Sequence, residues 1–150
     1  MEASEQAKKL IINTRPLYME KVKLWNGDDY LGYCHRISVS DQLRKIDKLS
    51  KKESISLLEK DIKRISSQLN KHLVTNVTQN QFDALVSLVY DIGIKALVTD
   101  ELFILLNKNK LTEVASQFRK FNKYMKKPIY QLIKNRKEEI KLFNKANLDE

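Results

Sequence analysis

The segment over residues 82–92 constrains the fold most, because polar side chains nearly vanish along it. Thr78 and Gln81 precede this segment with the spacing of a capping box, and Gly93 follows it where glycine commonly ends a helix. A helix that is apolar on most of its sides has to be buried. The sequence therefore predicts a central helix against which the other elements pack.

A second capping box, Ser50 to Glu53, begins a long amphipathic helix. Apolar residues then recur at spacings of three and four, which places them on one side of a helix of about six turns. These residues are Ile55, Leu58, Ile62, Ile65, Leu69 and Leu73. Shorter helices are expected over residues 4–13, 40–49, 95–107, 112–123 and 128–145.

One stretch, residues 17–33, indicates a β-hairpin. Asn26 and Gly27, a pair typical of tight hairpin turns, separate two strand-like runs, and no other part of the sequence indicates a sheet. Together the elements predict a mainly α (α+β) fold in a single domain over residues 1–150. We expect a small β-containing lobe at 14–50, a connecting helix at 50–73, and a helical lobe at 74–146 that packs with the helix at 4–13.

The chain of 150 residues has a formal net charge of +9 at pH 7. Such a charge favours polyanions as partners, for example nucleic acid, teichoic acid or an anionic membrane face. Basic residues occur along the whole chain, however, and we expect no Arg-rich or aromatic-interleaved patch, so motif support for nucleic-acid binding is weak. A solvated, lysine-rich surface explains the charge equally well.

Cys34 is the only cysteine, so we expect no disulfide within the chain, no metal site and no cofactor. The first six residues are polar and show no apolar signal region. No stretch approaches a membrane-spanning length. We therefore expect synthesis in a cytoplasm, after which the protein is kept there, packed into a particle such as a virion, or released at lysis.

Residues 73–88 closely resemble the "LTQNQFDALVS" core of the phage-type lysozymes, glycoside hydrolase family 24. Asp91 and Gly93 then stand where that family usually has Asn-x-Gly, and Gly32 to His35 resembles its Gly-Tyr-Gly-His. Weaker similarities follow at residues 117–122 and at Arg136, Glu139, Leu142 and Phe143. The resemblance extends over residues 10–143 and implies a lysozyme-like fold with a cleft between two lobes.

The family cleaves the sugar backbone of peptidoglycan in that cleft. It uses a Glu at the end of the first helix as general acid, and an Asp and a Thr in the hairpin lobe that serve the attacking water. Counting back from His35 without a gap places these three positions on Arg15, Leu24 and Tyr30. A guanidinium cannot give up its proton, and leucine can neither ionise nor orient water. Tyrosine keeps a hydroxyl, but its ring takes space that a sugar needs.

These substitutions lead to a main hypothesis and two alternatives. The main hypothesis is a catalytically inactive lysozyme-like protein (a pseudoenzyme) of phage, viral or prophage origin, with a structural or binding role. Its partner would be peptidoglycan, another glycan, or a protein of a virion or secretion assembly. One alternative is an active peptidoglycan muramidase (an endolysin) whose catalytic pair has moved to Glu20, Asp28 or Asp29. The other is a basic protein that binds nucleic acid or another polyanion.

Seven residues are candidates for lining the cleft or binding a ligand there: Arg15, Trp25, Tyr30, Tyr33, His35, Gln81 and Asp91. Trp25 could stack on a sugar ring or cap the core of the small lobe. Arg15 could hold an anion in the old cleft, or could have replaced the acid by drift. We expect His35 to be a structural residue near the floor of the cleft. We expect Cys34 to be a small buried hydrophobe and not a reactive thiol.

Overall fold

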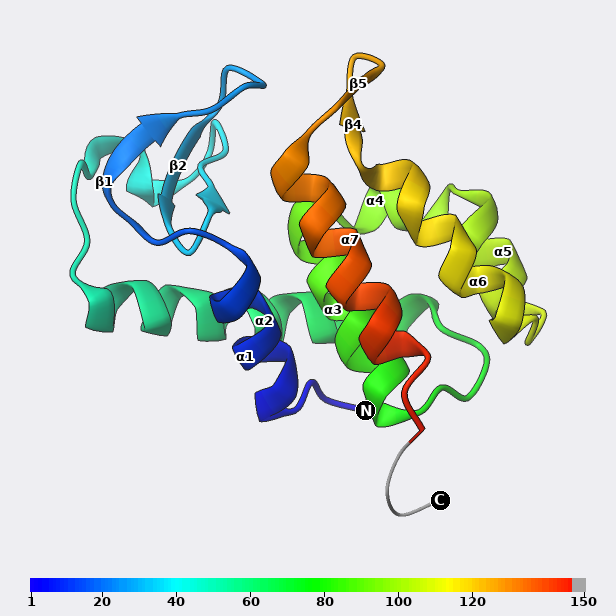
Figure 1. The fold of residues 1–150 in the computed structure, drawn as a ribbon. Coiled ribbons are helices and arrows are strands. Elements are labelled where there is room, and N and C mark those ends of the chain that lie inside the picture. The colour runs from blue at the N-terminus through cyan, green and yellow to red at the C-terminus, as the bar shows by residue number, and fades with distance from the viewer. Residues whose placement is uncertain (147–150) are drawn as a thin grey trace.

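The computed structural model describes residues 1–146, and one buried helix lies among the others at its centre (Figure 1). This helix, α3 (Gln79–Ile92), contacts α1 (Glu5–Thr14), α2 (Lys51–His72) and α7 (Tyr130–Phe143). Its Thr78–Gln81 capping box is formed, and its side chains from Phe82 to Val89 are buried. The prediction of a buried central helix is therefore confirmed.

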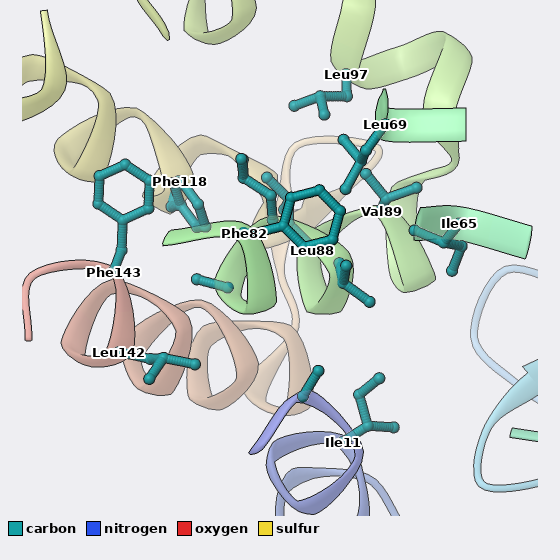
Figure 2. Close-up of a cluster of buried hydrophobic side chains, with 14 of the residues drawn as sticks. Ile11, Ile65, Leu69, Phe82, Leu88, Val89, Leu97, Phe118, Leu142 and Phe143 are labelled. Atoms are coloured by element: carbon teal, nitrogen blue, oxygen red, sulfur yellow. The ribbon is translucent and has the colours of Figure 1, made fainter. Parts of the chain in front are cut away.

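The hydrophobic core surrounds α3 on several sides, as Figure 2 shows. Phe118 and Phe143 pack against one another on one side, with ring centroids 5.5 Å apart. Ile65 of α2 and Ile11 of α1 cover other sides, and both are fully buried or nearly so. Each buried side chain of this size contributes about 1.5–3 kcal/mol to the free energy of unfolding.

Helix α2 runs along the molecule from the sheet to the other helices (Figure 1). Its capping box is complete, because Ser50 Oγ accepts from Glu53 N and Glu53 Oε1 accepts from Ser50 N, both at 3.0 Å. Leu58, Ile65 and Leu69 are buried on its inner side, as the predicted apolar stripe requires.

The predicted hairpin forms the first two strands of an antiparallel sheet in the order β1 (Tyr18–Lys23), β2 (Asp29–Gly32) and β3 (His35–Arg36). Gly27 has φ +80°, the left-handed conformation that favours glycine in a tight turn. Gly32, with φ +67°, ends β2 beside Ser54 of α2. The sheet is therefore fixed to the N-terminal part of α2.

The other helices depart from the predicted bounds. The helix expected over 95–107 is two helices, α4 (Ile94–Val98) and α5 (Glu101–Asn107), because the Asp100 side chain accepts from Leu102 N at 2.9 Å and starts a new helix. The one expected over 112–123 is α6 (Leu111–Gln117) followed by the 3₁₀ turn η2 (Phe118–Phe121). Only the 3₁₀ turn η1 (Gln42–Lys45) forms within residues 40–49.

Within residues 1–146, no helix combines the length and the apolar character that crossing a membrane requires.

A second hairpin contradicts the expectation that residues 17–33 hold the only β-structure. It consists of β4 (Lys123–Tyr124) and β5 (Lys127–Pro128), and it delays the start of α7 to Tyr130. Both residues of its turn have positive φ, +49° at Met125 and +69° at Lys126. That conformation normally requires Asn or Gly, so the sequence carries no hairpin signal there.

Candidate functional site

A cleft lies between the sheet and the helices, and it consists of two adjoining cavities. The outer cavity has a volume of about 370 Å³ and is lined by Trp25 and Asp28 from the sheet side and by Lys123 and Tyr124 from β4. The inner cavity, of about 60 Å³, is lined among others by Arg15 and Leu24. A larger hollow of about 750 Å³ lies elsewhere, between residues 2–8 and α2, and none of the predicted site residues lines it.

Arg15 lies at the inner end of this cleft, directly after α1. Its backbone is extended because Pro16 follows it, and this directs the chain out of the helix. Its side chain is only 1% exposed. Nη1 donates to Ser87 Oγ at 2.9 Å and Nη2 donates to the Ser87 carbonyl at 2.8 Å. The guanidinium is therefore held by α3 and does not point into open space.

Two acids and a second arginine complete a buried ionic network around Arg15. Arg15 Nη2 lies 2.9 Å from Asp91 Oδ2 and 3.3 Å from Glu139 Oε2. Arg136 pairs with the same two acids, and its Nε lies 2.6 Å from Glu139 Oε1. Two cations and two anions thus balance one another in a site that α1, α3 and α7 close.

The network sets the protonation of its acids. Burial alone would raise the pKa of Asp91, but the charges of Arg15 and Arg136 hold it below its usual range. Burial raises the pKa of Glu139 against the attraction of Arg136 and Arg15, but this carboxyl is fully enclosed and lines neither cavity of the cleft. Asp91 is therefore an ionised hydrogen-bond acceptor, unsuited to donate a proton.

Leu24 and Tyr30, to which the resemblance assigns the other two catalytic positions, line the inner cavity. Leu24 offers only an apolar surface there. The Tyr30 hydroxyl accepts a hydrogen bond from Asn26 Nδ2 at 2.7 Å. Burial raises the pKa of Tyr30, so its phenol is neutral at ordinary pH.

Of the three candidates for a relocated catalytic pair, only Asp28 lies in the cleft. Glu20 pairs with Lys48 at 3.5 Å and Asp29 with Lys23 at 3.2 Å, and both acids line a separate hollow on the outer side of the sheet. Asp28 does line the cleft, where it pairs with Arg36 at 2.5 Å. Within residues 1–146, Asp28 and Asp91 are the acids that line the two cavities.

Trp25 and Tyr124 meet across the mouth of the cleft. Their ring centroids lie 5.2 Å apart with the planes tilted by 54°, and Trp25 keeps 42% of its surface exposed. Trp25 therefore does not cap the core of the sheet region, one of the two roles considered for it. The pair joins the first hairpin to the second.

Three of the seven predicted cleft residues lie outside both cavities. Tyr33 belongs to the core, and Gln81 accepts from Thr78 N as part of the α3 capping box. His35 lies between Asp61 Oδ2 at 2.6 Å and Asp41 Oδ2 at 2.7 Å. Burial lowers the pKa of His35, but the two carboxylates outweigh this and raise the pKa above its usual value.

Cys34 takes the positive φ of +59° where the family has glycine. Burial raises the pKa of its thiol to about 12, so it is not a thiolate at ordinary pH. No group of three or more His, Cys, Asp or Glu side chains among residues 1–146 is arranged to hold a metal ion.

Sequence reasoning missed Ser87, Asn135 and Tyr124, which contact the predicted residues. Asn135 Nδ2 donates to Asp91 Oδ2 at 2.9 Å, and Ser87 binds Arg15 as described. The sequence does contain one indication of the ionic network. An acid at position 91 of an apolar, buried helix requires a cation beside it in the interior. Tyr124 had no such signal, since its hairpin was not predicted.

The known proteins that this chain resembles carry the names lysozyme, endolysin or muramidase. A family model described as phage lysozyme matches residues 18–139. An endolysin of Acyrthosiphon pisum secondary endosymbiont phage 1 is 31% identical over 97% of this chain and 100% of its own length. An endolysin of Bacillus phage B103 is 34% identical over 75% of this chain, and the match spans only 42% of that relative's length.

Solved structures show the same fold. The muramidase domain of SpmX from Asticaccaulis excentricus superposes with a TM-score of 0.82 and 28% identity, covering 97% of this chain and 99% of that domain. An endolysin from Escherichia coli O157:H7 phage FAHEc1 has a TM-score of 0.81 at 23% identity, covering 96% of this chain and 94% of that one. The predicted lysozyme-like, mainly α fold with a small sheet is confirmed.

Proposed function

Because this chain belongs to the phage lysozyme family, we propose that its cleft receives the sugar backbone of peptidoglycan and that it binds this polymer without cleaving it. The observation that carries the second half of the proposal is the Arg15 network. A buried guanidinium, balanced by Asp91 and Glu139, occupies the position that the resemblance gives to the general acid.

Cleavage of a glycosidic bond needs a carboxylic acid that protonates the leaving oxygen, and the loss of such an acid costs about 10²–10⁴ in rate. Arg15 cannot supply that proton at any workable pH. It also cannot turn away, because its departure would leave Asp91 and Glu139 in the interior with only Arg136. Neither Leu24 nor Tyr30 carries a carboxyl group that could donate this proton in its place.

The mouth of the cleft still offers what a glycan needs for binding. Trp25 and Tyr124 present aromatic faces, and Asn26, Asp28 and Arg36 provide polar groups beside them. The outer cavity of about 370 Å³ falls within the range of about 300–1,000 Å³ that is usual for ligand sites. By analogy with relatives named endolysins, we propose that the protein meets its glycan at the cell wall at lysis.

A second candidate is an active muramidase, and the comparisons favour it over the non-cleaving function. An endolysin shares 31% of its residues with this chain over nearly the whole length of both. In this case Asp28, the less buried of the two cleft acids, would have to take part in place of the family's Glu. The two candidates share the ligand and differ only in cleavage.

One experiment separates these candidates. Purified peptidoglycan is incubated with wild type, and both sedimentation with the insoluble polymer and release of soluble fragments are measured. We expect co-sedimentation without release. Fragment release by wild type would overturn the non-cleaving proposal, and its loss in Asp28→Asn but not in Asp29→Asn would then identify the acid. Absence of co-sedimentation would overturn glycan binding itself.

A gain-of-function variant tests the residue assignment. Arg15→Glu, Leu24→Asp and Tyr30→Thr introduce the side chains of the family's catalytic set at the assigned positions. Asp91→Asn is added so that the new carboxyl at position 15 does not also face Asp91, which leaves Glu139 and Arg136 as its charged neighbours. We expect this variant to gain measurable fragment release. The matched control carries Leu24→Asp, Tyr30→Thr and Asp91→Asn with Arg15 retained, and it should remain inert.

A further inference from the structure

Almost the whole net charge of the chain lies in one segment. Residues 114–137 contain eight of the 28 basic residues and none of the 19 acidic ones, so the rest of the chain carries 20 basic and 19 acidic residues. The expectation that the basic residues form no patch with aromatic residues among them is therefore wrong. Basic residues do occur along the whole chain, and residues 114–137 differ from the rest by their lack of acidic residues.

Most of these charges are free to meet a partner. Arg136 belongs to the buried network, and Lys120 pairs with Asp100 at 2.6 Å. The other six side chains are exposed and form no ion pair with any residue between 1 and 146. They are Arg119, Lys123, Lys126, Lys127, Lys134 and Lys137.

The same segment exposes large apolar side chains. Of eleven exposed large hydrophobic residues in the described chain, four fall between positions 124 and 133: Tyr124, Met125, Tyr130 and Ile133. Met125 is 79% exposed and Tyr130 is 80% exposed. Met125 also occupies the strained turn of the second hairpin, where a positive φ costs a non-glycine residue free energy. The fold thus exposes the apolar side chain of Met125 to solvent and spends conformational free energy on the turn that holds it there.

The residues share one end of the molecule. The β4–β5 hairpin projects from the edge of the fold and leads directly into α7 (Figure 1). On α7, the exposed residues Tyr130, Ile133, Lys134 and Lys137 follow at helical spacing and so lie on one side of it. We define the hairpin face as the following set: Met125, Lys126, Lys127, Tyr130, Ile133, Lys134 and Lys137.

We propose that the hairpin face binds an anionic phospholipid surface, independently of any glycan in the cleft. Lysines near such a surface are attracted to its headgroups, while methionine, isoleucine and tyrosine side chains enter the boundary between headgroups and acyl chains. A nucleic acid or an anionic wall polymer would match the lysines but would leave Met125 and Ile133 in water. The combination of charge and apolar surface therefore favours a membrane.

Docking in this way would orient the protein. Tyr124 belongs to the same hairpin and contacts Trp25 at the mouth of the cleft. A membrane bound at Met125 would therefore lie close to the cleft mouth. The glycan strands nearest the bilayer would be those presented to the cleft.

The test is co-sedimentation of the full chain with vesicles of phosphatidylcholine alone and of phosphatidylcholine mixed with phosphatidylglycerol. We expect binding only to the anionic vesicles. Lys126→Gln, Lys127→Gln and Lys134→Gln together should weaken it about 100-fold, at about 5-fold for each lysine. Met125→Ser with Tyr130→Ser should weaken it about tenfold or more. None of these five residues lines the cleft.

The matched control is Lys51→Gln, Lys52→Gln and Lys60→Gln, which removes the same charge from exposed positions on α2. This control should keep most of the binding. Failure to bind anionic vesicles at low salt, or an equal loss in the control, would overturn the proposal. A third outcome would also overturn it: the Met125→Ser, Tyr130→Ser variant binds vesicles as well as wild type does, and wild type binds soluble polyphosphate equally tightly. The hairpin face would then recognise anionic polymers in general and not a membrane. Circular dichroism establishes that each variant is folded.

Discussion

Arg15 is stable in the interior only because it has two acidic partners. Replacing it by methionine should lower the free energy of unfolding by about 3–5 kcal/mol, since Asp91 and Glu139 would be left with a single cation. Adding Asp91→Asn should recover part of that loss. Urea denaturation of the two single variants and the double variant measures this coupling. Lys48→Met, which breaks an exposed pair with Glu20, should cost about 1 kcal/mol or less.

His35 should make the stability of the fold depend on pH. Its folded pKa is raised, so its contribution is complete below the ordinary histidine pKa of about 6.5 and is lost as the pH rises through the folded pKa. The pKa of Asp41 is lowered, chiefly by the hydrogen bond from His35 against the effect of burial. Its contribution is therefore lost in the acid range, as the pH falls through its folded pKa.

The measurement is urea denaturation of wild type and His35→Gln across a pH series. The stability advantage of wild type should be largest in weakly acidic solution and should shrink towards alkaline pH. His72→Gln is the control, because His72 has no carboxylate partner among residues 1–146. A constant advantage over the whole series would contradict the role of the two carboxylates.

At this scale the sequence suggests which residues depart from the family's pattern, and that assignment stays a prediction, but the sequence does not show what those residues contact. Arg15 was located by counting from a motif, and the structure adds Ser87 and Glu139 as its partners. The assignment of His35 and Gln81 to the cleft was wrong because closeness along a motif was taken for closeness in space. His35 instead lies between Asp61 of α2 and Asp41, and Gln81 belongs to the capping box of α3.

The elements with a local chemical signal were predicted best. Both capping boxes and the Asn26–Gly27 turn were correct, because each is decided by hydrogen bonds within a few residues. The break between α4 and α5 depends on Asp100 acting as a helix cap in the middle of an apolar run. The β4–β5 hairpin carries no such signal, since its turn residues are unfavourable for the conformation they adopt.

That unfavourable turn gives a prediction about stability. Replacing Met125 by Asn and Lys126 by Gly should raise the free energy of unfolding by about 1–2 kcal/mol, because these residues adopt positive φ with less strain. Thermal and urea denaturation measure the gain. The same variant should bind anionic vesicles more weakly, since it loses the apolar tip and one lysine. A variant that lost stability would show that the turn is not strained.

On the scale of the whole molecule, the contact between Trp25 and Tyr124 joins the two sides of the cleft. Tyr124→Ala should remove about 0.5–1.5 kcal/mol of attraction between the rings and expose Trp25 further. Trp25 is the only tryptophan, so its fluorescence reports this change directly. We expect the emission to shift to longer wavelength, whereas Tyr130→Ala should leave it unchanged. An unaltered spectrum in Tyr124→Ala would indicate that the rings do not hold the cleft mouth together.

The overall fold could be predicted because a few motifs identified the family, and a family shares its arrangement of elements. The formation of a single domain over residues 1–150, with the lobe bounds expected from the sequence, stays a prediction. The surface could not be predicted in the same way. Which lysines gather at one end depends on a hairpin that only the three-dimensional structure reveals.

If Arg15 stands at the general-acid position, as proposed, the ionic network also bears on how easily a glutamate could arise there in evolution. A single change of Arg15 to glutamate would gather three carboxyl groups around the one guanidinium of Arg136. A single change of Asp91 to asparagine would leave two arginines facing one glutamate. Either single substitution alone gives a less stable protein. Selection would have to tolerate that protein before the second substitution could arise. On the proposed assignment, the coupling of charge between these two positions therefore opposes any stepwise return to a glutamate at position 15.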